Sequence, residues 1–74
     1  MVRRAEYNED DLRRMMLRLR EATRQPQVRL VFRDGHTLEG AITFVERFGT
    51  GRLINIEQEV AENFNIYELE RVEF

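Results

Sequence analysis

Residues 28–48 limit the possible folds of this chain more than any other stretch, because two runs of alternating apolar residues meet there at Asp34-Gly35. An Asp-Gly pair between two alternating runs is the strongest short-range signal of a β-hairpin, since both residues tolerate the positive φ angles of a tight turn. The sequence therefore predicts two antiparallel strands, with Gly35 as a structural residue in the turn between them.

A second glycine, Gly40, interrupts the second run on the face that carries Leu38, Ile42 and Phe44. Without a side chain on this core-facing side, the strand can bend sharply or another backbone can come close. A strand that bends in this way can belong to two sheets at once. We therefore assign Gly40 a structural role as the bend of the second strand.

The segment before the hairpin has the three- and four-residue spacing of an amphipathic helix. Asn8 is a candidate N-cap, and the acidic first turn that follows, Glu9 to Asp11, suits the positive end of a helix dipole. Pro26 disfavours helical backbone at the residue before it. The sequence predicts a helix over about 9–23, and its apolar stripe consists of Leu12, Met15, Met16, Leu19 and Ala22.

Three further short strands are expected after the hairpin. They cover, in order, 53–56, the run with Val60, Phe64 and Ile66, and 72–74 after a tight turn at 67–71. Five short and strongly bent antiparallel strands around one small core describe an SH3-like barrel, which closes on itself to limit exposed edges. We therefore expect a mainly β fold in one domain over 1–74, with an N-terminal α-helix at about 9–23 and a five-stranded bent antiparallel SH3-like barrel over about 27–74.

The chain lacks the cross-links that stabilise many small domains. It has 74 residues, no cysteine and no Cys/His pattern that would hold zinc, so oligomerisation is a candidate source of the missing stability. The last two strands are short and would leave unpaired backbone N–H and C=O groups in a monomer. The candidate interface residues there are Phe64, Asn65, Ile66, Val72 and Phe74.

Charge and composition narrow the possible functions. The formal charge of −2 argues against strong sequence-independent binding to nucleic acid. However, residues 1–25 carry seven Arg against five acids, and residues 26–74 carry five Arg against nine acids. No apolar run is long enough for a membrane span or a secretory signal, so we expect a cytoplasmic protein without membrane contact. No catalytic constellation, metal-ligand spacing or cofactor motif is present, and we expect neither an enzyme nor a small-molecule substrate.

The hairpin stretch resembles the first Sm motif of the Sm-like (LSm) family, above all of its bacterial branch, the RNA chaperone Hfq. The matching positions are Val28, Leu30, Phe32, Gly35, Leu38, Gly40, Ile42, Val45 and Glu46. The resemblance implies a helix on a five-stranded bent barrel, and a homo-oligomeric ring in which strand 4 of one subunit pairs with strand 5 of the next. It also implies binding of single-stranded RNA in RNA metabolism or post-transcriptional regulation.

Four residues are candidates for RNA contacts under this resemblance. Phe48, two residues after the motif acid, stands where the Hfq branch stacks an aromatic side chain on a base, with Arg47 beside it for a phosphate. Arg13 and Arg14 resemble the arginine patch that the same branch carries on the outer rim of its helix. Each pair has an ordinary structural alternative: a loop aromatic folded back onto the core, and the solvated polar face of a helix.

The second Sm motif departs from the family, because Asn65-Ile66-Tyr67 stands where the Hfq branch has Tyr-Lys-His. The Lys and His of that pore chemistry are therefore absent from these positions. Small SH3-like proteins such as the Rho inhibitor Rof share the helix-plus-barrel pattern and bind protein. A protein-interaction or structural module without an RNA site is the alternative function.

Overall fold

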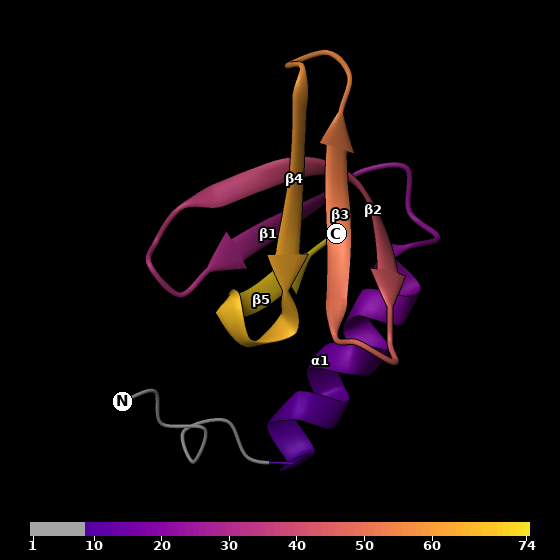
Figure 1. Cartoon of the computed structure of the whole chain (residues 1–74), viewed down its shortest axis with the longest axis vertical. Helices are drawn as coiled ribbons and strands as arrows, with labels where there is room; N and C mark the ends of the chain where they lie inside the picture. Colours follow the sequence, from indigo (N-terminus) through magenta and orange to yellow (C-terminus); the bar gives the residue numbers. More distant parts are fainter. Residues whose placement is uncertain (1–8) are drawn as a thin grey trace.

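The computed structural model describes residues 9–74, which form one helix and five antiparallel strands (Figure 1). In chain order the elements are α1 (Glu9–Ala22), β1 (Val28–Phe32), β2 (Thr37–Val45), β3 (Thr50–Asn55), β4 (Val60–Asn65), the 3₁₀ turn η2 (Ile66–Glu68) and β5 (Leu69–Glu73). The predicted succession of an N-terminal helix and five antiparallel strands is confirmed, and it is consistent with Sm-like topology.

The strands form one sheet in the order β4-β3-β2-β1-β5, so β4 and β5 are its two edges. Within the described residues no backbone ladder joins β4 to β5, and the closed barrel that the sequence predicts is not observed. Each edge strand therefore has one side that no other strand of residues 9–74 pairs.

The apolar stripe of α1 packs against the sheet, as its spacing predicts. Leu19 and Ala22 are fully buried, and the other three apolar residues of the stripe pack against the core at its rim. The helix ends at Ala22, one residue before the predicted end. Asn8, the expected N-cap, lies outside the described residues.

β1 and β2 form the predicted hairpin, with Asp34-Gly35 in the turn that connects them. Gly35 has a φ of +99°, a backbone conformation that favours glycine, and its N–H donates to the Phe32 carbonyl at 3.0 Å. The Asp34 carboxylate accepts the N–H of His36, also at 3.0 Å. Gly35 therefore supplies the positive φ of this turn.

β2 changes partners at Gly40. Up to this residue, which lies opposite Val28, β2 pairs with β1; from the next residue, Ala41 opposite Ile54, it pairs with β3. A Cβ atom at Gly40 would lie 2.5 Å from the Ile54 carbonyl oxygen, a distance that real Cβ atoms do not adopt. The missing side chain therefore permits the close approach of β3 at the point where β2 passes from one neighbour to the other.

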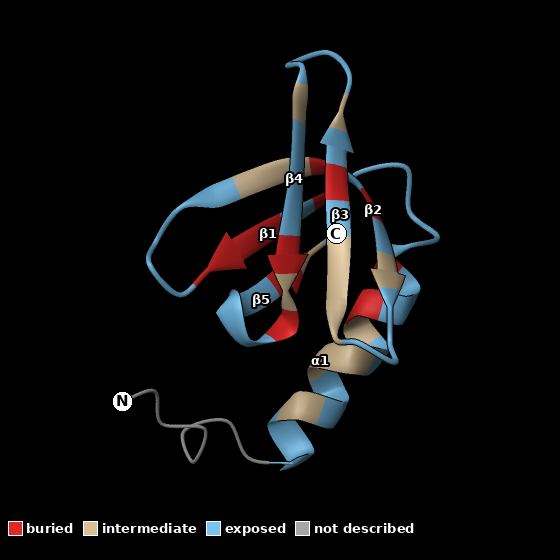
Figure 2. Cartoon of the chain, in the orientation of Figure 1, coloured by how far each residue is buried: buried red, intermediate tan, exposed pale blue. Residues whose placement is uncertain are grey.

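The core lies between α1 and the inner face of the bent sheet (Figure 2). Leu30, Leu53 and Leu69, from β1, β3 and β5, are at most 1% exposed and belong to a single cluster. The turn between β3 and β4, in contrast, projects beyond the rest of the sheet and is exposed throughout. One small core thus holds both halves of the sheet, while the β3–β4 turn and the two edges face outwards.

Candidate functional site

The turn between β2 and β3, residues 46–49, presents an aromatic side chain to solvent. The N–H groups of Phe48 and Gly49 both donate to the Val45 carbonyl, at 3.1 and 2.9 Å, and Gly49 leaves the turn with a φ of +68°. Phe48 is 68% exposed. Its ring therefore does not fold back onto the core, and its surface is open to a ligand.

Arg47 directly precedes Phe48 in this turn. Its guanidinium carbon lies 6.0 Å from the centroid of the Phe48 ring, at the outer limit of a cation–π contact. An arginine carries five N–H donors around its plane, so the turn combines a flat apolar surface with a neighbouring cation. This combination suits a nucleobase and its phosphate.

The turn that carries Phe48 lies against η2, the turn between β4 and β5. The N–H of Ile66 donates to the Gly49 carbonyl at 2.8 Å, and a Cβ atom at Gly49 would lie 3.3 Å from Cγ2 of Ile66. The two turns, which are far apart in the sequence, therefore support each other at the same end of the sheet.

Asn65 caps η2 and fixes its geometry. The side-chain oxygen of Asn65 accepts the N–H of Tyr67 at 2.8 Å, and the backbone N–H of Asn65 donates to the Glu68 carboxylate at 3.0 Å. Tyr67, which is 37% exposed, thereby becomes a further aromatic residue close to the β2–β3 turn. Tyr67 is not among the candidate residues that the sequence predicts.

A bidentate ion pair ties the β2–β3 turn to α1. Arg20 donates from Nε and Nη2 to the two carboxylate oxygens of Glu46, both at 2.8 Å. The hydrogen bonds from Arg20 lower the pKa of Glu46, and the same hydrogen bonds raise the pKa of Arg20. Glu46 therefore holds the turn in place next to Arg47.

We expect the Arg20–Glu46 ion pair to stabilise the fold slightly at neutral pH and to lose this effect in acid. A carboxyl group with a lowered pKa in the folded chain stabilises it above the unfolded pKa near 4.5, and that stabilisation is lost as pH falls through the folded pKa. The melting temperature of Glu46→Gln should therefore depend less on pH between about 6 and 3 than that of the parent. Because both side chains are about half exposed, the difference should be small. Thermal melts across this pH range measure the difference, with Glu57→Gln in the β3–β4 turn as control. Identical pH profiles of the melting temperature for Glu46→Gln and the parent would contradict the ion pair.

Arg13 and Arg14 do not lie in the same part of the molecule as Phe48. Both belong to the exposed first half of α1, whereas Arg20, which holds the β2–β3 turn, lies about 10 Å further along the helix axis. The Arg14 guanidinium is 3.9 Å from the Asp11 carboxylate, and its side chain is 81% exposed. The two helix arginines therefore form a surface separate from the aromatic turn.

Most of the interface candidates contribute their side chains to the core of the chain itself. Phe64, Ile66 and Val72 are at most 4% exposed, so a neighbouring chain can reach them only through their backbone. Phe74 differs, because it is 44% exposed and lies under the guanidinium of Arg18, whose central carbon is 3.7 Å from the ring centroid.

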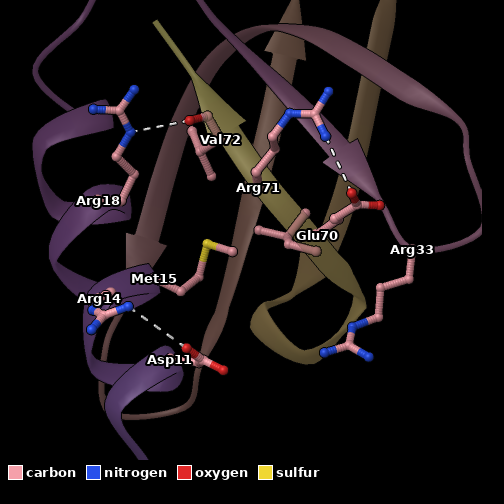
Figure 3. Close-up of a pocket in the computed structure, with 9 residues that line it drawn as sticks. Asp11, Arg14, Met15, Arg18, Arg33, Glu70, Arg71 and Val72 are labelled. Carbon is pink, nitrogen blue, oxygen red and sulfur yellow. Dashed lines mark hydrogen bonds and ion pairs between the residues drawn. The ribbon is translucent and has the colours of Figure 1, made fainter. Parts of the chain in front are cut away.

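A groove of about 670 Å³ runs between α1 and β5 (Figure 3). Charged side chains line it, namely Arg14, Arg18, Arg33, Arg71, Asp11 and Glu70. Apolar side chains line it as well, namely Met15, Leu69 and Val72. Local sequence patterns do not predict this groove, because its residues come from the helix, the β1–β2 turn and the last strand, which only the fold brings together.

No protein-family model matches the chain, and neither a curated protein nor a solved structure matches it. Within residues 9–74, no helix has the length and apolar character needed to cross a membrane. Nor do three His, Cys, Asp or Glu side chains of this part come together as potential metal ligands.

Proposed function

We propose that this chain is a subunit of an Sm-like ring that binds single-stranded RNA, with its bent sheet forming the SH3-like barrel of that family. The arrangement of the strands supports the ring. The sheet bends at Gly40 and ends in β4 and β5, and neither edge is covered by another strand of the described chain. Sm-like subunits pair strand 4 of one subunit with strand 5 of the next, and these are the two open edges here.

Pairing between unlike edges leads to a ring by geometry. Each chain offers β4 to one neighbour and β5 to the other, and such head-to-tail contacts close when the rotation between subunits divides a full turn. Pairing of the edges also removes a row of exposed backbone groups on each subunit. It would supply the stability that a 74-residue chain without disulfides otherwise has to obtain from a small core.

The main support for an RNA site is the exposure of the Phe48 ring. Stacking of a base on an aromatic side chain contributes about 1–3 kcal/mol and tolerates any base. Arg47 lies beside the ring, and the turn is held against η2, which brings Tyr67 to the same end of the sheet. In a ring each subunit repeats this turn, so successive bases of one strand can stack on successive subunits.

A protein-interaction module with the same fold is the second candidate. The charge of the sheet region favours it, because residues 26–74 carry five Arg against nine acids. A surface with this balance attracts phosphate weakly. The two functions differ in one measurable property, the affinity for single-stranded RNA.

Titration of the parent protein with labelled U-rich and A-rich RNA strands tests the proposal. We expect saturable binding at about 50 mM salt that weakens as salt is raised, because each phosphate contact releases counterions. A duplex of the same length is the control and should bind more weakly, since its bases are not free to stack on Phe48. Absence of measurable affinity for both single strands at low salt would contradict RNA binding and favour the protein-interaction module.

A further inference from the structure

The open edge of β5 runs along the groove between α1 and β5 and is partly occupied by a side chain of α1. Nε of Arg18 donates to the Val72 carbonyl at 3.1 Å (Figure 3). β1 pairs with the other side of β5, so this carbonyl points away from the sheet. It is the kind of acceptor that an added strand would use.

The groove has an excess of positive charge. Four guanidinium groups line it against two carboxylates. Within residues 9–74, the Arg14 guanidinium is paired only with Asp11, at 3.9 Å. Arg18 contacts the Val72 carbonyl and the Phe74 ring, and within the same residues neither of its terminal nitrogens bonds a carboxylate. Arg71, in contrast, is engaged by Glu70 and Glu73. The helix side of the groove is therefore the part best able to accept an anionic group.

The opposite edge of the sheet is acidic. The β3–β4 turn and β4 contain Glu57, Glu59 and Glu62, and no basic residue occurs between positions 53 and 70. Glu62 lies opposite the fully buried Leu53, on the strand face that carries Phe64 into the core, yet its own side chain is exposed. A charged residue at an inward-facing position of an edge strand opposes indiscriminate pairing. It permits pairing with a partner that supplies the opposite charge.

We propose that Arg18, in the groove between α1 and β5, selects the acidic β4 edge of a second copy of this chain by pairing with the Glu62 carboxylate of that copy. With the two strands antiparallel and centred on each other, Glu62, the third of the six residues of β4, would lie opposite the middle of β5. An amide of the incoming strand donates to the Val72 carbonyl in place of Arg18, and Arg18 turns to the Glu62 carboxylate of the neighbouring copy. Charge-assisted hydrogen bonds of this kind are about twice as strong as neutral ones.

This inference rests on the ring of the proposed function and adds to it the basis of partner choice. Edge pairing alone uses backbone groups, which any exposed strand can offer. The arginines of the groove select a strand with carboxylates at its centre, so β4 is preferred over the arginine-bearing β5 edge of another copy. Assembly should therefore be head-to-tail and should weaken as salt is raised.

A charge swap tests the inference. We expect Arg18→Glu and Glu62→Arg each to raise the dissociation constant of the assembly about tenfold or more, as loss of a close ion pair does. The double variant R18E/E62R, which keeps the net charge of the parent, should restore the constant to within about threefold. Light scattering against protein concentration, at low and high salt, provides the measurement.

Matched controls separate this pair from a general change in charge. Glu21→Arg, in the last turn of α1, and Arg24→Glu, just after the helix, lie outside the groove and should leave assembly unchanged. Circular dichroism melts verify that each variant folds. Should Arg18→Glu fail to fold, Arg14→Glu replaces it, because the Arg14 side chain is exposed and lines the same groove.

The possible outcomes separate the charge-based choice of partner from ring assembly itself. Assembly of the parent that is insensitive to salt, or a double variant no better than the singles, would overturn the role of the groove and leave edge pairing in place. A parent protein that stays monomeric at every concentration would overturn both.

Discussion

Gly40→Val should lower the free energy of unfolding by about 2–3 kcal/mol, the upper part of the usual range for an overpacked site. The first atom of any side chain at this position meets the Ile54 carbonyl oxygen at 2.5 Å, and that oxygen belongs to the backbone of β3, which cannot move without breaking the ladder. A domain of 74 residues has a total stability of only about 4–11 kcal/mol, so the loss is a large fraction of the whole.

Ala41→Val is the matched control for this prediction. Ala41 is the next residue of β2, is exposed on the other face, and also pairs with β3. A β-branched residue on the solvent side of a strand is tolerated or slightly favourable. The free energies of unfolding of the two variants, measured by chemical denaturation, should therefore differ by about 2–3 kcal/mol. If both unfold with the parent, the bend is not at Gly40.

Phe48→Ala and the double variant R13A/R14A should weaken RNA binding in different ways. Loss of a stacking ring should reduce affinity by about 5- to 150-fold for each stacked base while the dependence on salt stays the same. Loss of two phosphate contacts at the helix should instead reduce the slope of log K against log salt by about 1.4 for a single strand. The structure motivates this separation, because the helix arginines and the aromatic turn lie on different parts of the molecule.

Ile56→Ala is the control for the aromatic variant. Ile56 is an even more exposed apolar residue, at 85%, but it lies in the β3–β4 turn. Its removal should leave RNA affinity unchanged. Equal losses for Phe48→Ala and Ile56→Ala would contradict the assignment of Phe48 as a stacking surface, and an unchanged salt slope for R13A/R14A would remove the helix arginines from the RNA site.

The local signals in the sequence predicted much of the fold. The Asp34-Gly35 hairpin, the bend at Gly40 and the apolar stripe of the helix each depend on residues close together in the chain, and each is present. Their physical causes are turn conformation, steric space and periodicity, which a single sequence displays.

The elements near the C-terminus were predicted less well. β3 begins at Thr50 and not at Leu53, because residues 50–52 pair with residues 43–45 of β2. Gly51 allows this pairing, since a Cβ atom there would collide with the Thr43 carbonyl oxygen. β5 begins at Leu69 and not at residue 72. The reason is that the turn predicted at 67–71 is shorter: it is η2, which has only three residues and is capped by Asn65. Both boundaries depend on contacts with other strands, which local patterns do not reveal.

The candidate site depended even more on tertiary structure. The sequence identified Phe48 by its spacing from Glu46, but only the fold shows that the ring is exposed and that Arg20 holds the turn. Val72 is an interface candidate whose side chain lies in the core, so the sequence alone does not reveal that only its backbone remains accessible. The contact of Arg18 with its carbonyl spans 54 positions in the chain, beyond the reach of any sequence pattern.

The mass of the parent protein in solution tests the central claim most directly, because ring assembly through β4 and β5 underlies the proposed function. Light scattering after size separation, over a wide range of protein concentration, should give one discrete mass that is a whole multiple of the 8.9 kDa subunit. Above the concentration at which the assembly dissociates, the mass should not grow further as protein is added, as expected for a closed ring. A mass of one subunit at every concentration, or a mass that grows continuously with concentration as in an open filament, would contradict the account.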